Sequence, residues 1–235
     1  MVADLVIPAY NEAATILAVL GALPRRVFRH VVVADNGSTD GTAQLARKAG
    51  AVVVIEVQRG YGAACLAGLR WIDQQNNPPD AVAFLDADLS DDPSQLLRLI
   101  DPIIQNDADL VIGSRVRFAQ PQSLATHQRI GNGVACWLIY LTTGRRYYDL
   151  GPMRVIRWSS LTELAMSDHT WGWTVEMQYK AAVNRIRTLE LDVPYRRRQG
   201  GVSKISGNLV GSVKAGAKII STIARLAWQQ RCQWR

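Results

Sequence analysis

The chain has 235 residues, of which 48% are hydrophobic and 20% charged, a composition typical of a globular protein with a full core. Its three cysteines are scattered, which excludes a disulfide framework and a cysteine-ligated metal cluster and favours a reducing, cytoplasmic compartment. The first residues run directly into an apolar segment and no apolar run is long enough to span a bilayer. We therefore expect neither a signal peptide nor a membrane-spanning helix.

The net charge of +7 is concentrated near the C-terminus. Residues 185–235 hold eleven lysines and arginines against Glu190 and Asp192, which leaves a net charge of about −2 on the rest of the chain. Such an asymmetry requires an anionic partner or an anionic surface. No nucleic-acid-binding motif accompanies the charge, so we expect no nucleic acid among the partners.

Short apolar strands alternate with helical segments through the first half of the chain. The pattern predicts strands at residues 5–7, 31–34, 51–57, 81–85 and 109–112. It predicts one helix that ends near residue 20 and three more at residues 43–49, 63–72 and 96–104. This alternation predicts an α/β fold with a mostly parallel central sheet flanked by helices. Ligands of such sheets bind beyond the carboxyl ends of the strands, where each polar motif described below lies.

Two aspartates follow the fourth predicted strand, in the sequence Asp86-Ala87-Asp88. On an extended backbone this spacing points both carboxylates to the same side. Two like charges side by side are accommodated when a divalent cation, with a phosphate-bearing ligand behind it, lies between them. The alternative is a solvated acidic turn that caps the next helix, and the motif alone would favour that interpretation.

Four segments together resemble family 2 glycosyltransferases of the GT-A fold, and in particular the dolichol- or polyprenyl-phosphate sugar transferases. They are, in chain order, Val6–Glu12, Asp35–Thr42, Asp86–Asp88 and Gly113–Arg115. The resemblance covers the first half of the chain closely and the second half more loosely. It implies inversion at the anomeric carbon by direct displacement.

The resemblance also implies a division of the chain. Residues 1–204 would form a single GT-A catalytic domain, with a nucleotide-sugar-binding half at 1–115 and an acceptor half at 116–204. Residues 205–235 would form a basic amphipathic helix and tail.

For the donor site, the resemblance implies that the loop after the first strand and Asp35 hold the base and ribose of a UDP- or GDP-linked sugar. Asp86 would contact the nucleotide, and Asp88 would bind Mg²⁺ or Mn²⁺. Gly60 would let the backbone approach the donor at a helix N-terminus, or it belongs to a plain turn. The residues expected at the nucleotide sugar are Pro8, Ala9, Tyr10, Glu12, Asp35, Gly60, Asp86, Ala87, Asp88 and Arg115.

For the acceptor half, the resemblance implies two acids and a basic loop. Asp149 matches the start of an acceptor-side motif, and Glu176 resembles an acid near the sugar, or is a surface residue of a helix. Arg198, Ser203 and Lys204 match a glycine-rich loop that would bind phosphate oxygens. The alternative for this loop is a solvated basic segment. The catalytic candidates are therefore Asp88, Asp149, Glu176 and Arg198.

The segment from Asn208 to Trp228 is predicted to form one amphipathic helix with lysines and an arginine beside its apolar face. Such a helix lies in an anionic membrane interface or packs on the domain. Trp228 and Trp234, with their flanking arginines, suit an interfacial tail. Relatives often carry transmembrane helices beyond this point and this chain stops, so we expect any membrane contact to be peripheral.

The sequence thus predicts a metal-dependent, inverting glycosyltransferase that moves a sugar from a nucleotide-diphosphate sugar to a lipid-linked acceptor such as polyprenyl phosphate. A phosphate acceptor needs little general base, whereas a hydroxyl acceptor would require one, for which Asp149 and Glu176 are the candidates. The second alternative is a non-catalytic module that binds a nucleotide sugar.

Overall fold

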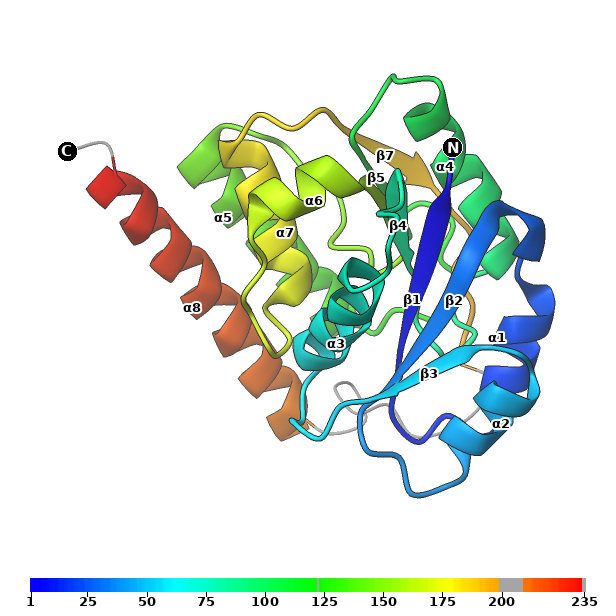
Figure 1. Cartoon of the computed structure of the whole chain (residues 1–235). Coiled ribbons are helices and arrows are strands. Elements are labelled where there is room, and N and C mark those ends of the chain that lie inside the picture. Colours follow the sequence, from blue (N-terminus) through cyan, green and yellow to red (C-terminus); the bar gives the residue numbers. More distant parts are fainter. Residues whose placement is uncertain (122, 199–208, 234–235) are drawn as a thin grey trace.

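The computed structural model describes residues 1–121, 123–198 and 209–233. Within this part a seven-stranded sheet has the order β3-β2-β1-β4-β6-β5-β7 (Figure 1). β6 runs antiparallel to both of its neighbours, and the other paired strands are parallel. The strands are β1 (Ala3–Ala9), β2 (Phe28–Asp35), β3 (Val52–Ile55), β4 (Ala81–Phe84), β5 (Leu110–Ser114), β6 (Arg154–Arg157) and β7 (Thr188–Asp192). The predicted α/β fold with a mostly parallel sheet is confirmed.

Helices cover both faces of the sheet (Figure 1). One face carries α1 (Ile16–Ala22), α2 (Thr42–Lys48) and α4 (Leu96–Ile104). The other carries α3 (Tyr61–Asp73), α5 (Thr126–Thr143), α6 (Trp158–Leu164) and α7 (Trp173–Val183). α8 (Leu209–Gln233) forms an outer layer against α5 and α7. Single 3₁₀ turns span Arg25–Val27 and Pro93–Gln95.

The central strand β1 divides the apolar core into two layers. Its side chains alternate between the faces, so Leu5 and Ile7 join the layer under α1, α2 and α4, while Val6 joins the layer under α3. All seven residues of β1 are buried. Burial of this apolar surface on both faces is the main term that stabilises the sheet.

Two local differences from the predicted elements matter for the site. β4 ends at Phe84, so Asp86 and Asp88 lie in a turn rather than on an extended strand, and Leu89 in this turn has a φ of 61°. β6, which the alternation did not predict, lies between β4 and β5. The strand carrying Arg154 therefore separates the four parallel strands β1 to β4 from β5.

α8 packs on the domain, as one of the two alternatives for the C-terminal helix predicted. Ile223 and Leu226 are buried in the same apolar layer as α5 and α7. Lys218 forms an ion pair with Asp168, with Nζ 2.9 Å from Oδ2. The face of α8 that combines these apolar and basic residues therefore contacts protein. Trp234 lies outside the described residues. No helix in the described ranges is both long and apolar enough to cross a membrane.

Candidate active site

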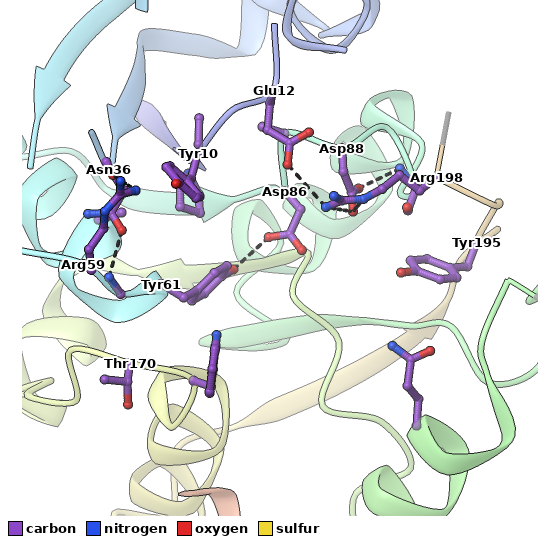
Figure 2. Close-up of a pocket in the computed structure, with 18 of the residues that line it drawn as sticks. Tyr10, Glu12, Asn36, Arg59, Tyr61, Asp86, Asp88, Thr170, Tyr195 and Arg198 are labelled. Carbon is purple, nitrogen blue, oxygen red and sulfur yellow. Dashed lines mark hydrogen bonds and ion pairs between the residues drawn. The ribbon is translucent and has the colours of Figure 1, made fainter. Parts of the chain in front are cut away.

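The carboxyl ends of β1, β2, β3 and β4 meet at one edge of the sheet, because these strands are parallel. In the register, Ala9 of β1 pairs with Asp35 of β2, and Asp35 pairs with Ile55 of β3. The loops that follow the strands surround a cavity of about 740 Å³ (Figure 2). We call it the large cavity. Its lining includes Pro8, Ala9, Tyr10, Glu12, Asn36, Arg59, Gly60, Tyr61, Asp86, Ala87, Asp88, Arg115, Thr170, Trp171, Tyr195 and Arg198.

Hydrogen bonds between loops fix the wall that carries the aspartates. The backbone N–H of Glu12 donates to Oγ1 of Thr42 at 2.9 Å, which ties the loop after β1 to the start of α2. The hydroxyl of Thr15 donates to the carbonyl oxygen of Ala87 at 2.7 Å. The turn of the two aspartates is therefore held in place by neighbouring loops.

Asp86 and Asp88 both face the large cavity, as predicted (Figure 2). Oδ1 of Asp86 accepts a hydrogen bond from the hydroxyl of Tyr61 at 3.0 Å, and Oδ1 of Asp88 accepts one from the backbone N–H of Ser90 at 2.9 Å. Burial, together with the charge of Asp88, raises the pKa of Asp86 to about 7. The charged form of Asp86 is therefore disfavoured, and a cation bound beside it would favour that form.

Arg198 supplies a cation at this position. Its Nε and Nη2 lie 3.0 and 2.9 Å from Oδ2 of Asp88, and Nη2 also lies 3.3 Å from Oε1 of Glu12. Figure 2 shows the guanidinium group between the two carboxylates. Arg198 of the predicted basic loop therefore contacts the predicted acidic motif.

The residues present fit a hard divalent ion that is bound jointly with a phosphate. Among the described residues, no group of three or more His, Cys, Asp or Glu side chains is arranged to hold a metal ion. Asp86 and Asp88 offer carboxylate oxygens, the ligand type that Mg²⁺ and Mn²⁺ prefer. The remaining coordination positions would come from ligand oxygens and water.

A smaller cavity of about 200 Å³ adjoins the large one, and Arg115 and Gln128 line both. Arg115 is held by a two-pronged pair with Asp149, with Nε to Oδ2 and Nη2 to Oδ1 both at 2.8 Å. Its guanidinium carbon lies 5.1 Å from the ring centre of Tyr195. The first turns of α5 add Arg129 to the lining. This smaller cavity is therefore lined by two arginines together with the carboxylate of Asp149 that pairs with Arg115.

Comparisons with known proteins agree with this geometry. The family model described as "Glycosyl transferase family 2" matches residues 4–161. The chain belongs to this family. It is 39% identical over 210 residues to an uncharacterized glycosyltransferase of Mycobacterium tuberculosis, covering 89% of this chain and 92% of the relative. It is 31% identical over 225 residues to the undecaprenyl-phosphate mannosyltransferase of Micrococcus luteus, covering 88% of each.

Among solved structures, the fold is similar to that of glucosyl-3-phosphoglycerate synthase from Mycobacterium tuberculosis, in a complex with Mn²⁺, UDP and glucosyl-3-phosphoglycerate. The TM-score is 0.73 at 20% identity, covering 97% of this chain and 80% of the other. The predicted GT-A fold is confirmed, and the chain is a family 2 glycosyltransferase.

The two acids predicted as general bases in this glycosyltransferase both have protein partners. Asp149 is buried against Arg115, and it lines the smaller cavity but not the large one. Burial alone would raise the pKa of Asp149, but the Arg115 guanidinium outweighs burial and holds the pKa below its usual range. A carboxylate with a lowered pKa and a committed partner is a poor base.

Glu176 is fully buried at the start of α7, and it holds the preceding loop. Its carboxylate accepts hydrogen bonds from the hydroxyl of Ser167 at 2.8 Å and from the backbone N–H of Asp168 at 2.7 Å, and Nζ of Lys180 lies 2.8 Å away. It does not line the large cavity. Both carboxylates are therefore committed to protein partners in the structure, and the catalytic roles of Asp149 and Glu176 stay predictions.

Most residues predicted at the nucleotide sugar line the large cavity, but Asp35 does not. Asp35 is buried, and its Oδ2 accepts a hydrogen bond from the backbone N–H of Ser38 at 3.0 Å. Its neighbour Asn36 lines the cavity instead. Ser203 and Lys204, predicted to bind phosphate, lie outside the described residues.

Gly60 and Gly62 allow a close approach of protein backbone at the start of α3. A Cβ at Gly60 would overlap the carbonyl oxygen of His169, and Gly60 has a φ of +147°. A Cβ at Gly62 would overlap the carbonyl oxygen of Asp168. The backbone N–H of Gly62 donates to the carbonyl oxygen of Thr170 at 3.1 Å. The first turn of α3 thus contacts this loop, and Gly60 also lines the large cavity.

Sequence reasoning missed several lining residues of the large cavity. The guanidinium carbon of Arg59 lies 3.9 Å from the ring centre of Tyr10, so the two side chains form one wall (Figure 2). Tyr61 donates to Asp86, and Trp171 also lines the cavity. The sequence Arg59-Gly60-Tyr61 follows a strand end, and this position was the signal that could have identified them.

Proposed function

We propose that this glycosyltransferase transfers a sugar from a nucleotide-diphosphate sugar to a lipid phosphate such as polyprenyl phosphate, with Mg²⁺ or Mn²⁺ held by Asp86 and Asp88. One observation carries the proposal. Arg115 lies between a large cavity that contains paired carboxylates and a smaller cavity lined by arginines. Two anionic substrates can therefore meet at one fixed guanidinium group.

The large cavity is the proposed donor site. Its volume of about 740 Å³ is suitable for a nucleotide sugar, and Tyr10 and Arg59 provide a flat wall. A bound ion would neutralise the charge on the leaving diphosphate. The Mn²⁺ and UDP named with the structurally similar synthase support this assignment.

The smaller cavity is the proposed site of the acceptor phosphate. Its volume of about 200 Å³ suits a small anionic group, and Arg115 and Arg129 supply guanidinium donors. A phosphate is already anionic, so it needs little general base, which agrees with the occupied carboxylates of Asp149 and Glu176. The name of the Micrococcus luteus relative supports a lipid phosphate.

Positioning and electrostatic stabilisation would supply most of the rate. Asp149 fixes Arg115 in one orientation by two parallel hydrogen bonds. Arg198 can leave Asp88 and bind phosphate oxygens when a donor enters, because both partners suit its fork of N–H groups. Attack by a phosphate oxygen from the side of the smaller cavity would displace the nucleoside diphosphate directly and invert the anomeric carbon.

The test is transfer with purified full-length protein, Mn²⁺, and a set of UDP- and GDP-sugars. Undecaprenyl phosphate and undecaprenol, both in detergent, are the paired acceptors, and mass spectrometry of the lipid gives the readout. We expect a sugar adduct on the phosphate only, and none with Asp88→Asn. An adduct on undecaprenol alone, or no lipid adduct with any donor, would contradict the proposal.

A further inference from the structure

α5 exposes an apolar stripe on its outer side. The exposed side chains are spaced i, i+4, i+7 and i+11, which places them on one side of a helix. They are Ile130 (62% exposed), Val134 (41%), Trp137 (58%) and Leu141 (57%). The opposite side of α5 packs into the core through Ala135, Cys136 and Ile139. A helix that packs on a domain normally carries polar side chains on its outer face, so this stripe requires a partner.

The charges around the stripe indicate which partner it fits. Residues 126–146, which comprise α5 and the turn after it, contain no Asp or Glu. Arg129 lies in the first turns of α5, and Arg145 and Arg146 follow its end, and all three are exposed. An apolar centre with cationic ends and no acid complements the surface of a bilayer that contains anionic lipid.

α8 offers no comparable surface within its described side chains. Its apolar residues Ile223 and Leu226 are buried, and Lys218 pairs with Asp168. Trp228 is 68% exposed and Ile220 48%, but these two large apolar side chains are eight positions apart with only Ala224 between them along that face, whereas the stripe on α5 has four. The larger exposed apolar surface therefore lies on α5 and not on α8.

We propose that the stripe on α5 is the surface through which this glycosyltransferase docks on an anionic membrane. The same helix contributes Arg129 and Gly133 to the smaller cavity, and the exposed Tyr148 lies at that cavity as well. Docking through α5 would bring the smaller cavity to the lipid headgroups. This last step depends on the proposed function, whereas membrane docking itself does not.

The experiment measures co-sedimentation of the purified full chain with two kinds of vesicle, in the absence of any donor sugar. One contains phosphatidylglycerol and phosphatidylcholine, and the other contains phosphatidylcholine alone. We expect binding to the anionic vesicles only, weakened at least about tenfold by the double variant Trp137→Ser, Leu141→Ser. Trp228→Ser is the matched control, because it removes an even more exposed tryptophan on α8, and we expect less than a twofold change.

Further measurements distinguish an anionic membrane from a second copy of the chain as the partner of the stripe. Arg145→Gln with Arg146→Gln should weaken binding to anionic vesicles and reduce its dependence on salt. Circular dichroism and light scattering of each variant establish that it folds and report its oligomeric state. Unchanged vesicle binding by the Trp137, Leu141 variant would overturn the proposal. So would a dimer that this variant dissociates, because the partner would then be a second copy.

These outcomes are distinct from a failure of the proposed function. Vesicle binding requires no transfer, so docking through α5 can hold even if no lipid phosphate accepts a sugar. Conversely, transfer to a short-chain prenyl phosphate in solution should be unaffected by Trp137→Ser, because that side chain lies outside both cavities.

Discussion

The guanidinium group of Arg198 lies on the carboxylate of Asp88, with Nε and Nη2 3.0 and 2.9 Å from Oδ2, although 110 positions separate the two residues in the sequence. Both residues line the large cavity, and Nη2 of Arg198 also lies 3.3 Å from Oε1 of Glu12. A divalent ion that binds Asp88 must compete with this guanidinium group. A diphosphate relieves the competition, because it offers Arg198 an alternative anion.

The competition predicts an unusual phenotype for Arg198→Ala. Removing the guanidinium group should strengthen binding of Mn²⁺ in the absence of donor several-fold, while turnover falls by about tenfold or more, because a stabilising charge is lost. Isothermal titration with Mn²⁺ and an initial-rate assay provide the two measurements. Arg196→Ala is the control, since Arg196 pairs with Asp92 at 2.8 Å and does not line the large cavity. Weaker binding of Mn²⁺ to the Arg198 variant would contradict the competition.

Glu176→Gln should keep its turnover within about threefold of the wild type when the rate is expressed per folded molecule. The loss of a true general base costs about 10²- to 10⁴-fold. The substitution should instead lower the melting temperature, because Lys180 and the backbone N–H groups of the 167–168 loop lose a charged acceptor. Thermal unfolding and kcat measured on the same preparation separate the two effects. A fall of a hundredfold in kcat with an unchanged melting temperature would restore the role as a base.

The close approach at α3 predicts opposite effects of two glycine substitutions. Gly62→Ala should destabilise the protein by about 2 kcal/mol or more, because its Cβ would overlap the carbonyl oxygen of Asp168. Gly131→Ala in α5 should be neutral or stabilise by up to about 1 kcal/mol, because no atom lies within 4 Å of the added Cβ. Urea unfolding measures both. Equal changes in the free energy of unfolding of the two variants would show that the backbone contact at α3 does not cause the loss of stability in Gly62→Ala.

The ion pairs of Asp109 with Arg157 and Arg187 should make a pH-dependent contribution to stability. Its carboxylate accepts hydrogen bonds from Nε of Arg187 at 2.8 Å and from Nε of Arg157 at 3.1 Å, and the bond from Arg187 chiefly lowers the pKa of Asp109. A lowered pKa in the folded state stabilises the fold at pH values above about 4, the usual pKa of an unfolded Asp, and this contribution is lost as the pH falls through the folded value. Asp109→Asn should therefore cost about 1–2 kcal/mol at neutral pH and less near about pH 3.

Urea unfolding of wild type and Asp109→Asn over this pH range measures the effect. Asp107→Asn is a matched control, because this neighbouring side chain is exposed, and its change should stay below about 0.5 kcal/mol. If the free energies of unfolding of wild type and Asp109→Asn differ by the same amount at both ends of the pH range, the lowered pKa of Asp109 does not contribute to stability.

The sequence predicted features that depend on the backbone more successfully than features that depend on side-chain partners. Strand ends follow from the alternation of apolar segments, so the meeting of Asp86, Asp88 and the loop after β1 could be predicted. The burial of Asp149 and Glu176 could not, because each is determined by a partner that is distant in sequence or by a loop conformation. For the same reason the apolar stripe of α5 could not be distinguished from a core face.

At Asp35, the sequence did not predict which of two adjacent residues lines the large cavity. The last residue of β2 points into the protein, and the next residue, Asn36, lines the large cavity. A shift of one position on a strand reverses the direction of the side chain. Sequence resemblance alone does not decide between two adjacent polar residues.

The central claim is that a divalent ion at Asp86 and Asp88 joins the protein to the diphosphate of the donor. Calorimetric titration of UDP and GDP into wild type and Asp88→Asn, with Mn²⁺ or with a chelator, tests it most directly. We predict that Mn²⁺ strengthens binding of one nucleotide to wild type by at least about tenfold and that Asp88→Asn abolishes this gain. Equal nucleotide affinity with Mn²⁺ and with chelator, or a gain that persists in Asp88→Asn, would contradict the claim.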